Sequence, residues 1–384
     1  MNILFYQHQY PAFGGIETVT TMLANAFAED GHKVAIASFI HKDGTDLLEK
    51  LHSSVKWHEL PEASLDSPAN LNALKTIFTD FKPDKVIFQD SYANIQHLLF
   101  KAMGDIRPIV VEHSAPCFSI ARRMNPLTVV EIAKRIVLFL FRPVFVSRRF
   151  RRESARRKEL FDAANCYVIL SRNYRHRIER MVGRERMEKL RVIPNPIAGN
   201  FCEVDLAAKK KQLLFVGSMI AIKGVDRLLE IWRELAPRHS DWEFVIVGDG
   251  VERSRLEAMV AKCGIGRVRF EGFKRDVAPY YRNASIFVMA SDFEGWPMVL
   301  GEAMSQACVP VAYDSFAGAS DIIDDGINGR VVRHFKQERY VAVLDELMAN
   351  DALRAKMASA AREKARCYAI ENIKREWYTL LNKG

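Results

Sequence analysis

Short apolar runs that alternate with helical segments constrain this 384-residue chain more than any other feature. The chain opens with the run ILFYQ (3–7), the loop HQYPAFGG, a helix from about Ile16 and a second run, KVAIASF (33–39). A strand, a glycine-rich loop, a helix and a strand in this order are typical of a parallel sheet of the Rossmann kind. We therefore expect an α/β fold.

The alternation passes through two rounds that a proline-rich segment separates. The first round continues with the apolar runs at 85–90, 108–114 and 166–171, and the second begins with QLLFVGS (212–218). Between them, VIPNPIAGN (192–200) contains structure-breaking prolines and a glycine, as interdomain linkers do. The length also exceeds what one ordinary core needs.

These boundaries predict two doubly wound Rossmann-like domains that face each other across a cleft. The first spans 1–193 and the second 194–366, and a C-terminal helix (367–384) is expected to pack back on the first domain. Ligands of open parallel sheets bind beyond the carboxyl ends of the strands. We therefore expect the functional site in the cleft.

Composition disfavours a membrane-spanning, secreted, disulfide-stabilised or metal-binding protein. The chain is 49% apolar and 27% charged, and it contains neither a run of eighteen apolar residues nor a secretion signal at its start. Its six cysteines are scattered singly and its histidines lack ligand spacing, so we expect a cytoplasmic protein without disulfides or a bound metal.

The net charge of +9 belongs to one segment, 122–158, which holds twelve Lys or Arg and two Glu. Its second half mixes arginines with Phe, Leu, Ile and Val, a composition that suits an anionic membrane surface. A solvated basic face over a core helix is the plainer alternative, and nucleic acid is disfavoured because no recognition fold accompanies the segment. We predict peripheral association with the inner face of the cell membrane.

The stretch 291–313 combines two carboxylates with a helix start. Glu294 and Glu302 lie eight positions apart, and Pro297 between them suits the beginning of a helix. The free N–H groups of such a helix start attract anions, and the hydroxyls of a sugar or ribose could satisfy a carboxylate among apolar neighbours. Two helix-terminal glutamates in a solvated loop are the alternative.

Three further positions carry chemistry after predicted strands. Gly14 and Gly15 would let backbone approach a phosphate, although a plain tight turn is as good an explanation. Lys223, near the start of a helix, could pair with a pyrophosphate or could simply face solvent. His113 ends a strand, where it could bind a ligand, transfer a proton or have a purely structural role. The nearest dinucleotide fingerprint, GDGVER (248–253), lacks its third glycine, which disfavours a dehydrogenase.

Five motifs, in the order in which they occur along the chain, resemble those of retaining glycosyltransferases of family 4. Enzymes of this type have the GT-B fold and build bacterial cell-surface polysaccharides. The motifs are GGIE (14–17), EHS (112–114), VGSMIAIKG (216–224), FEGWPMVLGEAM (293–304) and DDGINGRVV (324–332), and they span nearly the whole chain. The resemblance implies transfer of a sugar from a nucleoside-diphosphate donor to an acceptor hydroxyl, on a glycan or lipid-linked acceptor of the cell envelope, with no metal or cofactor.

The resemblance also implies residue roles. Lys223 would neutralise the pyrophosphate, Glu294 would hold the donor sugar and Glu302 the ribose, while His113 would contact the sugar near the reacting carbon. The rest of the donor site would consist of Gly14, Gly15, Ser218, Gly272, Phe273, Gly295, Trp296, Met298 and Val299.

One position departs from the family pattern, because Ser218 stands where an arginine usually contacts the diphosphate. Either Lys274 or Arg275 compensates, or turnover is reduced. A catalytically weak sugar-nucleotide-binding protein and a soluble glucan or disaccharide synthase therefore stay open as alternatives.

Overall fold

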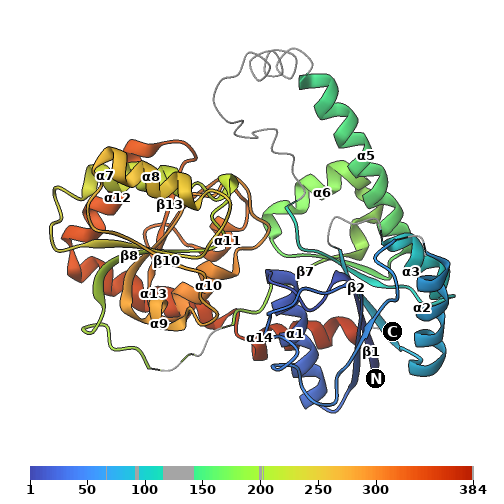
Figure 1. The fold of residues 1–384 in the computed structure, drawn as a ribbon. Coiled ribbons are helices and arrows are strands. Elements are labelled where there is room, and N and C mark those ends of the chain that lie inside the picture. Colours follow the sequence, from blue (N-terminus) through green and yellow to red (C-terminus); the bar gives the residue numbers. More distant parts are fainter. Residues whose placement is uncertain (66, 91–94, 116–141, 199–200, 202, 383–384) are drawn as a thin grey trace. The chain divides into compact units, whose positions relative to one another are not determined.

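The computed structural model describes residues 1–65, 67–90, 95–115, 142–198, 201 and 203–382. The chain divides into two compact units (Figure 1). Unit 1 contains the described residues up to Pro196 together with those from Ile370 onward, and unit 2 spans Ile197–Ala369. These divisions fall three residues after the predicted limits at 193 and 366.

Unit 1 is built on a parallel sheet in the order β3-β2-β1-β4-β5-β6-β7. Its described strands are β1 (Asn2–Gln9), β2 (Lys33–Ile40), β3 (Lys56–Glu59), β4 (Lys85–Asp90), β5 (Ile109–Glu112), β6 (Cys166–Ile169) and β7 (Leu190–Val192). Its described helices are α1 (Gly15–Glu29), α2 (Pro68–Phe81), α3 (Gln96–Ala102), α5 (Arg142–Ala163), α6 (Arg175–Val182) and α14 (Ile370–Leu381). The strand order reverses between β1 and β4.

Unit 2 repeats the plan with a parallel sheet in the order β10-β9-β8-β11-β12-β13. Its strands are β8 (Lys210–Val216), β9 (Glu243–Val247), β10 (Val268–Gly272), β11 (Ala284–Met289), β12 (Val309–Tyr313) and β13 (Arg330–Val332). Its helices are α7 (Val225–Leu235), α8 (Arg253–Cys263), α9 (Ala278–Asn283), α10 (Met298–Ser305), α11 (Ala319–Ile322), α12 (Gln337–Ala349) and α13 (Asp351–Arg366). The expected fold class, two doubly wound Rossmann-like domains, is confirmed.

Two strands of unit 1 escape the sequence analysis. β3 consists of KWHE, in which no residue is fully buried, and β7 has only three residues and falls at the start of the expected linker. Both lie at an edge of the sheet, where a strand needs only one neighbour and little apolar surface. A search for buried apolar runs therefore passes over them.

A buried ion pair joins α5 to the sheet of unit 1. The Arg157 guanidinium donates from Nε to both oxygens of Glu112 at 3.1 Å and also from a terminal nitrogen, and the Tyr167 hydroxyl donates to Glu112 at 2.8 Å. The two charged side chains are 5% and 1% exposed. Removal of one partner from such a pair strands a buried charge and costs about 3–5 kcal/mol.

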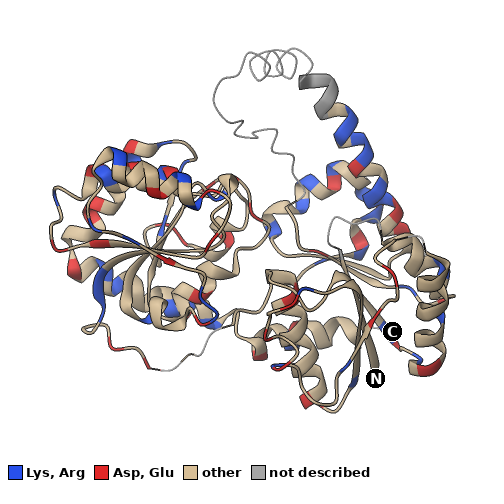
Figure 2. Ribbon diagram, viewed as in Figure 1, with Lys and Arg blue, Asp and Glu red and all other residues tan. Residues whose placement is uncertain are grey.

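This ion pair corrects the interpretation of the basic segment in part. Arg157 belongs to 122–158, yet it points into the protein and does not contribute to a basic surface. Arg148, Arg151 and Arg152 on the same helix are exposed, and Figure 2 shows the concentration of basic residues along α5. Residues 122–141 of the segment lie outside the described part of the chain.

The last helix, α14, packs on α1 within unit 1. Tyr378 donates a hydrogen bond of 2.6 Å to Asp30 at the end of α1, and Lys374 forms an ion pair of 2.8 Å with the same carboxylate. The Trp377 ring meets Phe27 edge to face at 6.5 Å. The C-terminal end of the chain is thereby part of the first unit's core.

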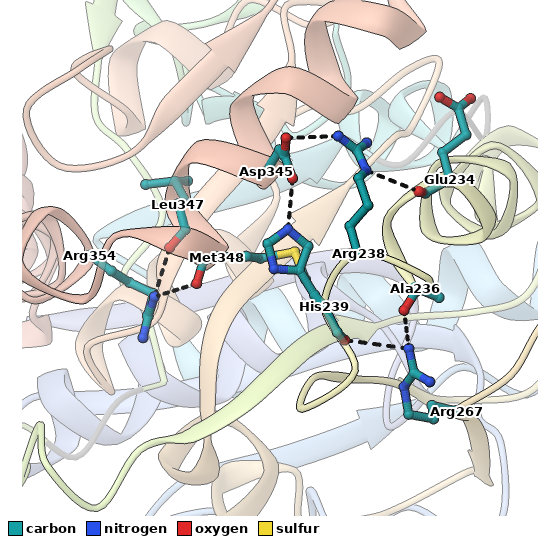
Figure 3. A network of polar contacts seen from close by, with 9 residues as sticks. All are labelled: Glu234, Ala236, Arg238, His239, Arg267, Asp345, Leu347, Met348 and Arg354. Carbon is teal, nitrogen blue, oxygen red and sulfur yellow. Dashed lines mark hydrogen bonds and ion pairs between the residues drawn. The ribbon is translucent and has the colours of Figure 1, made fainter.

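A polar network ties α7 to α12 in unit 2 (Figure 3). Asp345 of α12 accepts 2.8 Å and 2.7 Å hydrogen bonds from Arg238 and His239, which follow α7, and Arg238 also donates to the Glu234 carbonyl oxygen at 3.3 Å. The contact to Glu234 satisfies a carbonyl group that the end of α7 leaves without a helical partner. They fix two helices that cover one face of the sheet.

Candidate active site

Three successive strands of unit 2 end in glycines at the carboxyl edge of the sheet. Gly217 and Gly248 follow β8 and β9, and Gly272 ends β10. All three have positive φ, and a Cβ atom on Gly248 would lie 1.9 Å from the Gly217 carbonyl oxygen. Only glycine permits this close approach of the two backbones. The glycines therefore let the ends of neighbouring strands pack closely at this edge.

An ion pair stands beside this edge, where the strand order reverses between β8 and β11. The Lys223 ammonium lies 2.6 Å from a carboxylate oxygen of Glu294, and the two side chains are 23% and 13% exposed. Lys223 ends the 3₁₀ turn Ala221–Lys223, and Glu294 lies in the loop after β11. The structure thus brings together two residues that are seventy-one positions apart and were predicted for one donor site.

Lys223 lies near the start of α7, as predicted, and Gly224 separates the 3₁₀ turn from the helix. Gly224 has φ 65° and ψ 31°, the left-handed conformation, and α7 begins at Val225. A Cβ atom there would lie 2.3 Å from the Ala290 carbonyl oxygen at the end of β11. This glycine lets the turn approach β11 closely, next to the loop that carries Glu294.

A second, buried ion pair supports the first. Arg227 of α7 pairs with Asp292 at 2.7 Å, and these side chains are only 8% and 7% exposed. The Asp292 backbone N–H also donates to the Ile222 carbonyl oxygen at 2.8 Å. The segments that carry Lys223 and Glu294 are therefore held together by contacts of their neighbours in sequence, Ile222 and Asp292.

The short helix α10 presents its N-terminus after Glu294. Pro297 is the N-cap residue, one position before the predicted place in the first turn. Helix geometry leaves the N–H groups of Met298 and Val299 without carbonyl partners inside the helix. Met298 is buried and Val299 half-buried, so these N–H groups form part of a partly desolvated, anion-attracting helix start.

Glu302 lies in α10 and is held by a buried tyrosine. The Tyr281 hydroxyl donates a 3.0 Å hydrogen bond to Glu302 Oε2. Burial raises the pKa of Glu302 to about 7, even though this hydrogen bond favours the ionised form. The carboxyl group therefore changes charge near neutral pH.

The other predicted donor-site residues of unit 2 differ in exposure. Ser218 and Phe273 are exposed, the latter at 54%, and Gly295 follows Glu294 in the loop. The Trp296 ring is buried and meets Tyr368 edge to face at 5.3 Å. Most of the Trp296 side chain is therefore buried by packing within unit 2.

Sequence reasoning missed Arg253, the last residue of the GDGVER segment. One guanidinium nitrogen of Arg253 lies 3.1 Å from the point that a Cβ atom on Gly272 would occupy. Asp249 and Glu257 hold the side chain at 3.0 Å and 2.8 Å. Its position after a strand and two glycines could have indicated an anion-binding residue, although the segment lacks the third glycine of a dinucleotide fingerprint.

In unit 1, His113 directly follows β5 and is buried. Its Nε2–H donates to Gln89 Oε1, while Nδ1 has no hydrogen-bond partner among the residues described. Burial lowers the pKa of His113 to about 3, so the imidazole is neutral at physiological pH. Gly14 caps α1 and Gly15 is its first residue, and both are exposed.

The described part of the chain contains neither a cluster of metal ligands nor a membrane-spanning helix. Within the described ranges, no three His, Cys, Asp or Glu side chains gather as metal ligands would. Among the same residues, no helix has the length and apolarity needed to cross a bilayer.

Comparison with known proteins identifies the class. Residues 13–198 match the family model "Glycosyltransferase Family 4", and residues 200–364 match "Glycosyl transferases group 1". A Campylobacter jejuni relative is 24% identical over 380 residues, covering 96% of this chain and 95% of the relative. Its name describes an N-acetylgalactosaminyltransferase that acts on an undecaprenol-diphosphate-linked oligosaccharide.

Two further matches agree. The amylovoran biosynthesis glycosyltransferase AmsD of Erwinia amylovora is 33% identical over 177 residues, which are 46% of this chain and 49% of AmsD. Anabaena Alr3699/HepE, solved with UDP-glucose, superposes with a TM-score of 0.77 at 18% identity over the full length of both chains, and shows the fold. The chain is a glycosyltransferase with the GT-B fold.

The raised pKa of Glu302 predicts a specific pH dependence of stability. The folded state retains a proton that the unfolded state releases near pH 4.5, so stability falls as pH rises from about 4.5 to about 7. Glu302→Gln should remove this fall, on the order of 1–3 kcal/mol. Thermal unfolding of both proteins between pH 5 and 8 measures it, with the exposed Glu338→Gln as control. Parallel curves for wild type and Glu302→Gln would contradict the assignment.

Proposed function

We propose that the carboxyl edge of the unit 2 sheet binds a nucleoside-diphosphate sugar and that the enzyme transfers this sugar with retention of anomeric configuration. The observation that carries the proposal is the Lys223–Glu294 ion pair beside the glycine-lined edge. It combines a cation for the diphosphate with a carboxylate for sugar hydroxyls. In the free protein each group holds the other.

The residues around this pair supply the remaining parts of a donor site. The N–H groups of Met298 and Val299, at the start of α10, donate hydrogen bonds to the distal phosphate. Glu302 accepts hydrogen bonds from the ribose hydroxyls. Arg253 provides a cation at Gly272, at the same carboxyl edge of the sheet as Ser218, which stands in place of the usual arginine. Lysine, arginine and helix N–H groups together replace a metal ion as stabilisers of the leaving diphosphate.

The proposed chemistry proceeds on one face of the sugar. The bond between the anomeric carbon and the diphosphate oxygen breaks, its electron pair stays on the phosphate, and the acceptor oxygen bonds to the same face of the carbon. The acceptor proton passes to the departing phosphate. In unit 1, the neutral His113 has an Nδ1 lone pair that suits a hydrogen bond from a sugar hydroxyl rather than proton donation.

We further propose a lipid-linked or cell-envelope glycan as acceptor. Support comes from the relatives, one of which acts on an undecaprenol-linked glycan while the other serves amylovoran synthesis by its name. This acceptor class places the enzyme at the cytoplasmic side of the membrane and favours polysaccharide synthesis over a soluble disaccharide synthase.

A panel of nucleotide sugars tests the donor site. The donor that raises the melting temperature most should be hydrolysed slowly with release of the nucleoside diphosphate, EDTA should not slow this reaction, and NMR should detect the retained anomer first. Lys223→Ala and Glu294→Ala should each lower turnover about 10²–10³-fold.

Lys262→Ala and Glu338→Ala serve as matched controls, because both residues are exposed on other helices of unit 2. Equal turnover of Lys223→Ala, Glu294→Ala and the controls would contradict the donor assignment. An inverted first product would contradict retention. Donor binding without turnover would favour a catalytically weak binding protein.

The exposed arginines of α5 carry the proposed membrane contact. Arg148, Arg151 and Arg152 each contribute about 1 kcal/mol near an anionic surface. Their joint replacement by Gln should weaken binding to phosphatidylglycerol vesicles at low salt roughly 100-fold. The triple variant Lys262→Gln, Lys336→Gln, Arg339→Gln is the control. Equal binding to phosphatidylcholine vesicles, or none to either kind, would contradict the contact.

A further inference from the structure

A small polar cavity opens at the carboxyl end of β1 in unit 1. It has a volume of about 190 Å³ and is lined by Gln7, His8, Gln9, Ile16 and Glu17. The cavity lies at the reversal of strand order between β1 and β4, where open parallel sheets bind ligands. None of its lining residues belongs to the donor site assigned above.

Glu17 is the distinctive residue of this cavity. It is only 9% exposed, yet no Lys, Arg or His in the described part of the chain lies within ion-pair distance of its carboxylate. The buried Glu112 and Asp292, by contrast, are both neutralised by arginines. Burial raises the pKa of Glu17, and a hydrogen bond from its own backbone N–H and the more distant Lys42 offset this only in part. A buried carboxylate without a cation needs hydrogen-bond donors.

Gly14 makes room for this carboxylate. A Cβ atom on Gly14 would lie 2.3 Å from Glu17 Oε2, and Gly14 has φ 177°, which any residue can adopt. A side chain at position 14 would therefore displace the Glu17 carboxylate, although the backbone conformation there does not demand glycine. This gives the GGIE motif a role that a phosphate cradle does not explain.

The other walls of the cavity offer hydrogen-bonding groups without positive charge. Thr20 donates to Gln7 Oε1 at 2.6 Å, and Gln7 Nε2 donates to the Gln9 carbonyl oxygen at 2.7 Å, which fixes the amide and leaves it one further N–H. Burial lowers the pKa of His8, so its ring is neutral at physiological pH. A site with a carboxylate and no cation repels phosphate.

We propose that this cavity binds one sugar ring of the acceptor, with Glu17 accepting hydrogen bonds from two of its hydroxyl groups. The inference deepens the proposed function and rests on it. The carboxylate already accepts a hydrogen bond from its own backbone N–H, and a neutral polyol supplies further donors without a cation. The volume is below the roughly 300–1,000 Å³ of sites for larger ligands, so the cavity admits a single ring and not a second nucleotide.

The test uses methyl α-glycosides of glucose, galactose, mannose and N-acetylglucosamine as probes, with binding measured by saturation-transfer NMR on the full chain. At least one glycoside should bind wild type. Glu17→Gln should weaken that binding about tenfold or more, because a hydrogen bond to a charged group is lost. Gly14→Ala should weaken it as well, by displacing the carboxylate.

Glu29→Gln is the matched control, since Glu29 is an exposed glutamate on the same helix. Melting temperatures establish that every variant is folded. No glycoside binding to wild type, or equal binding to Glu17→Gln and Glu29→Gln, would overturn the proposal. Donor-induced stabilisation of wild type is scored separately: its absence would tell against the proposed donor site, whereas its presence without glycoside binding would tell only against the acceptor cavity.

Discussion

The reversal of strand order in each parallel sheet determines where the two candidate sites lie. In unit 2 it falls between β8 and β11, and in unit 1 between β1 and β4. Connections from the two neighbouring strands leave toward opposite faces, so their carboxyl ends are not covered by one crossover. The Lys223–Glu294 pair stands at the first reversal and the Glu17 cavity at the second.

Charges at these edges fall into structural and functional kinds according to their partners. The pairs Arg157–Glu112 and Arg227–Asp292 are almost fully buried, and each joins a helix to a sheet or loop. Lys223 and Glu294 are more exposed, so a ligand could take the place of each group's partner in the ion pair. The buried pairs fix the backbone, whereas the partly exposed pair is the one that we propose binds the donor.

Sequence patterns predicted the fold well wherever strands are apolar and buried, because parallel strands covered on both faces read as continuous apolar runs. They failed for β3 and β7, whose edge positions need little apolar surface. The meeting of Lys223 with Glu294 followed from motif order. Arg157 could not be assigned, because its sequence context does not show that a buried carboxylate lies opposite it. Arg253 was missed although it follows a strand and two glycines.

The central claim is that the carboxyl edge of the unit 2 sheet binds the donor. Hydrogen–deuterium exchange with and without the best-stabilising nucleotide sugar tests it most directly, since protection reports local opening along the backbone. Donor binding at this edge should slow exchange over 217–224 and 292–304, with little change over α12 and α13. Unchanged exchange in those two segments, with protection elsewhere, would contradict it.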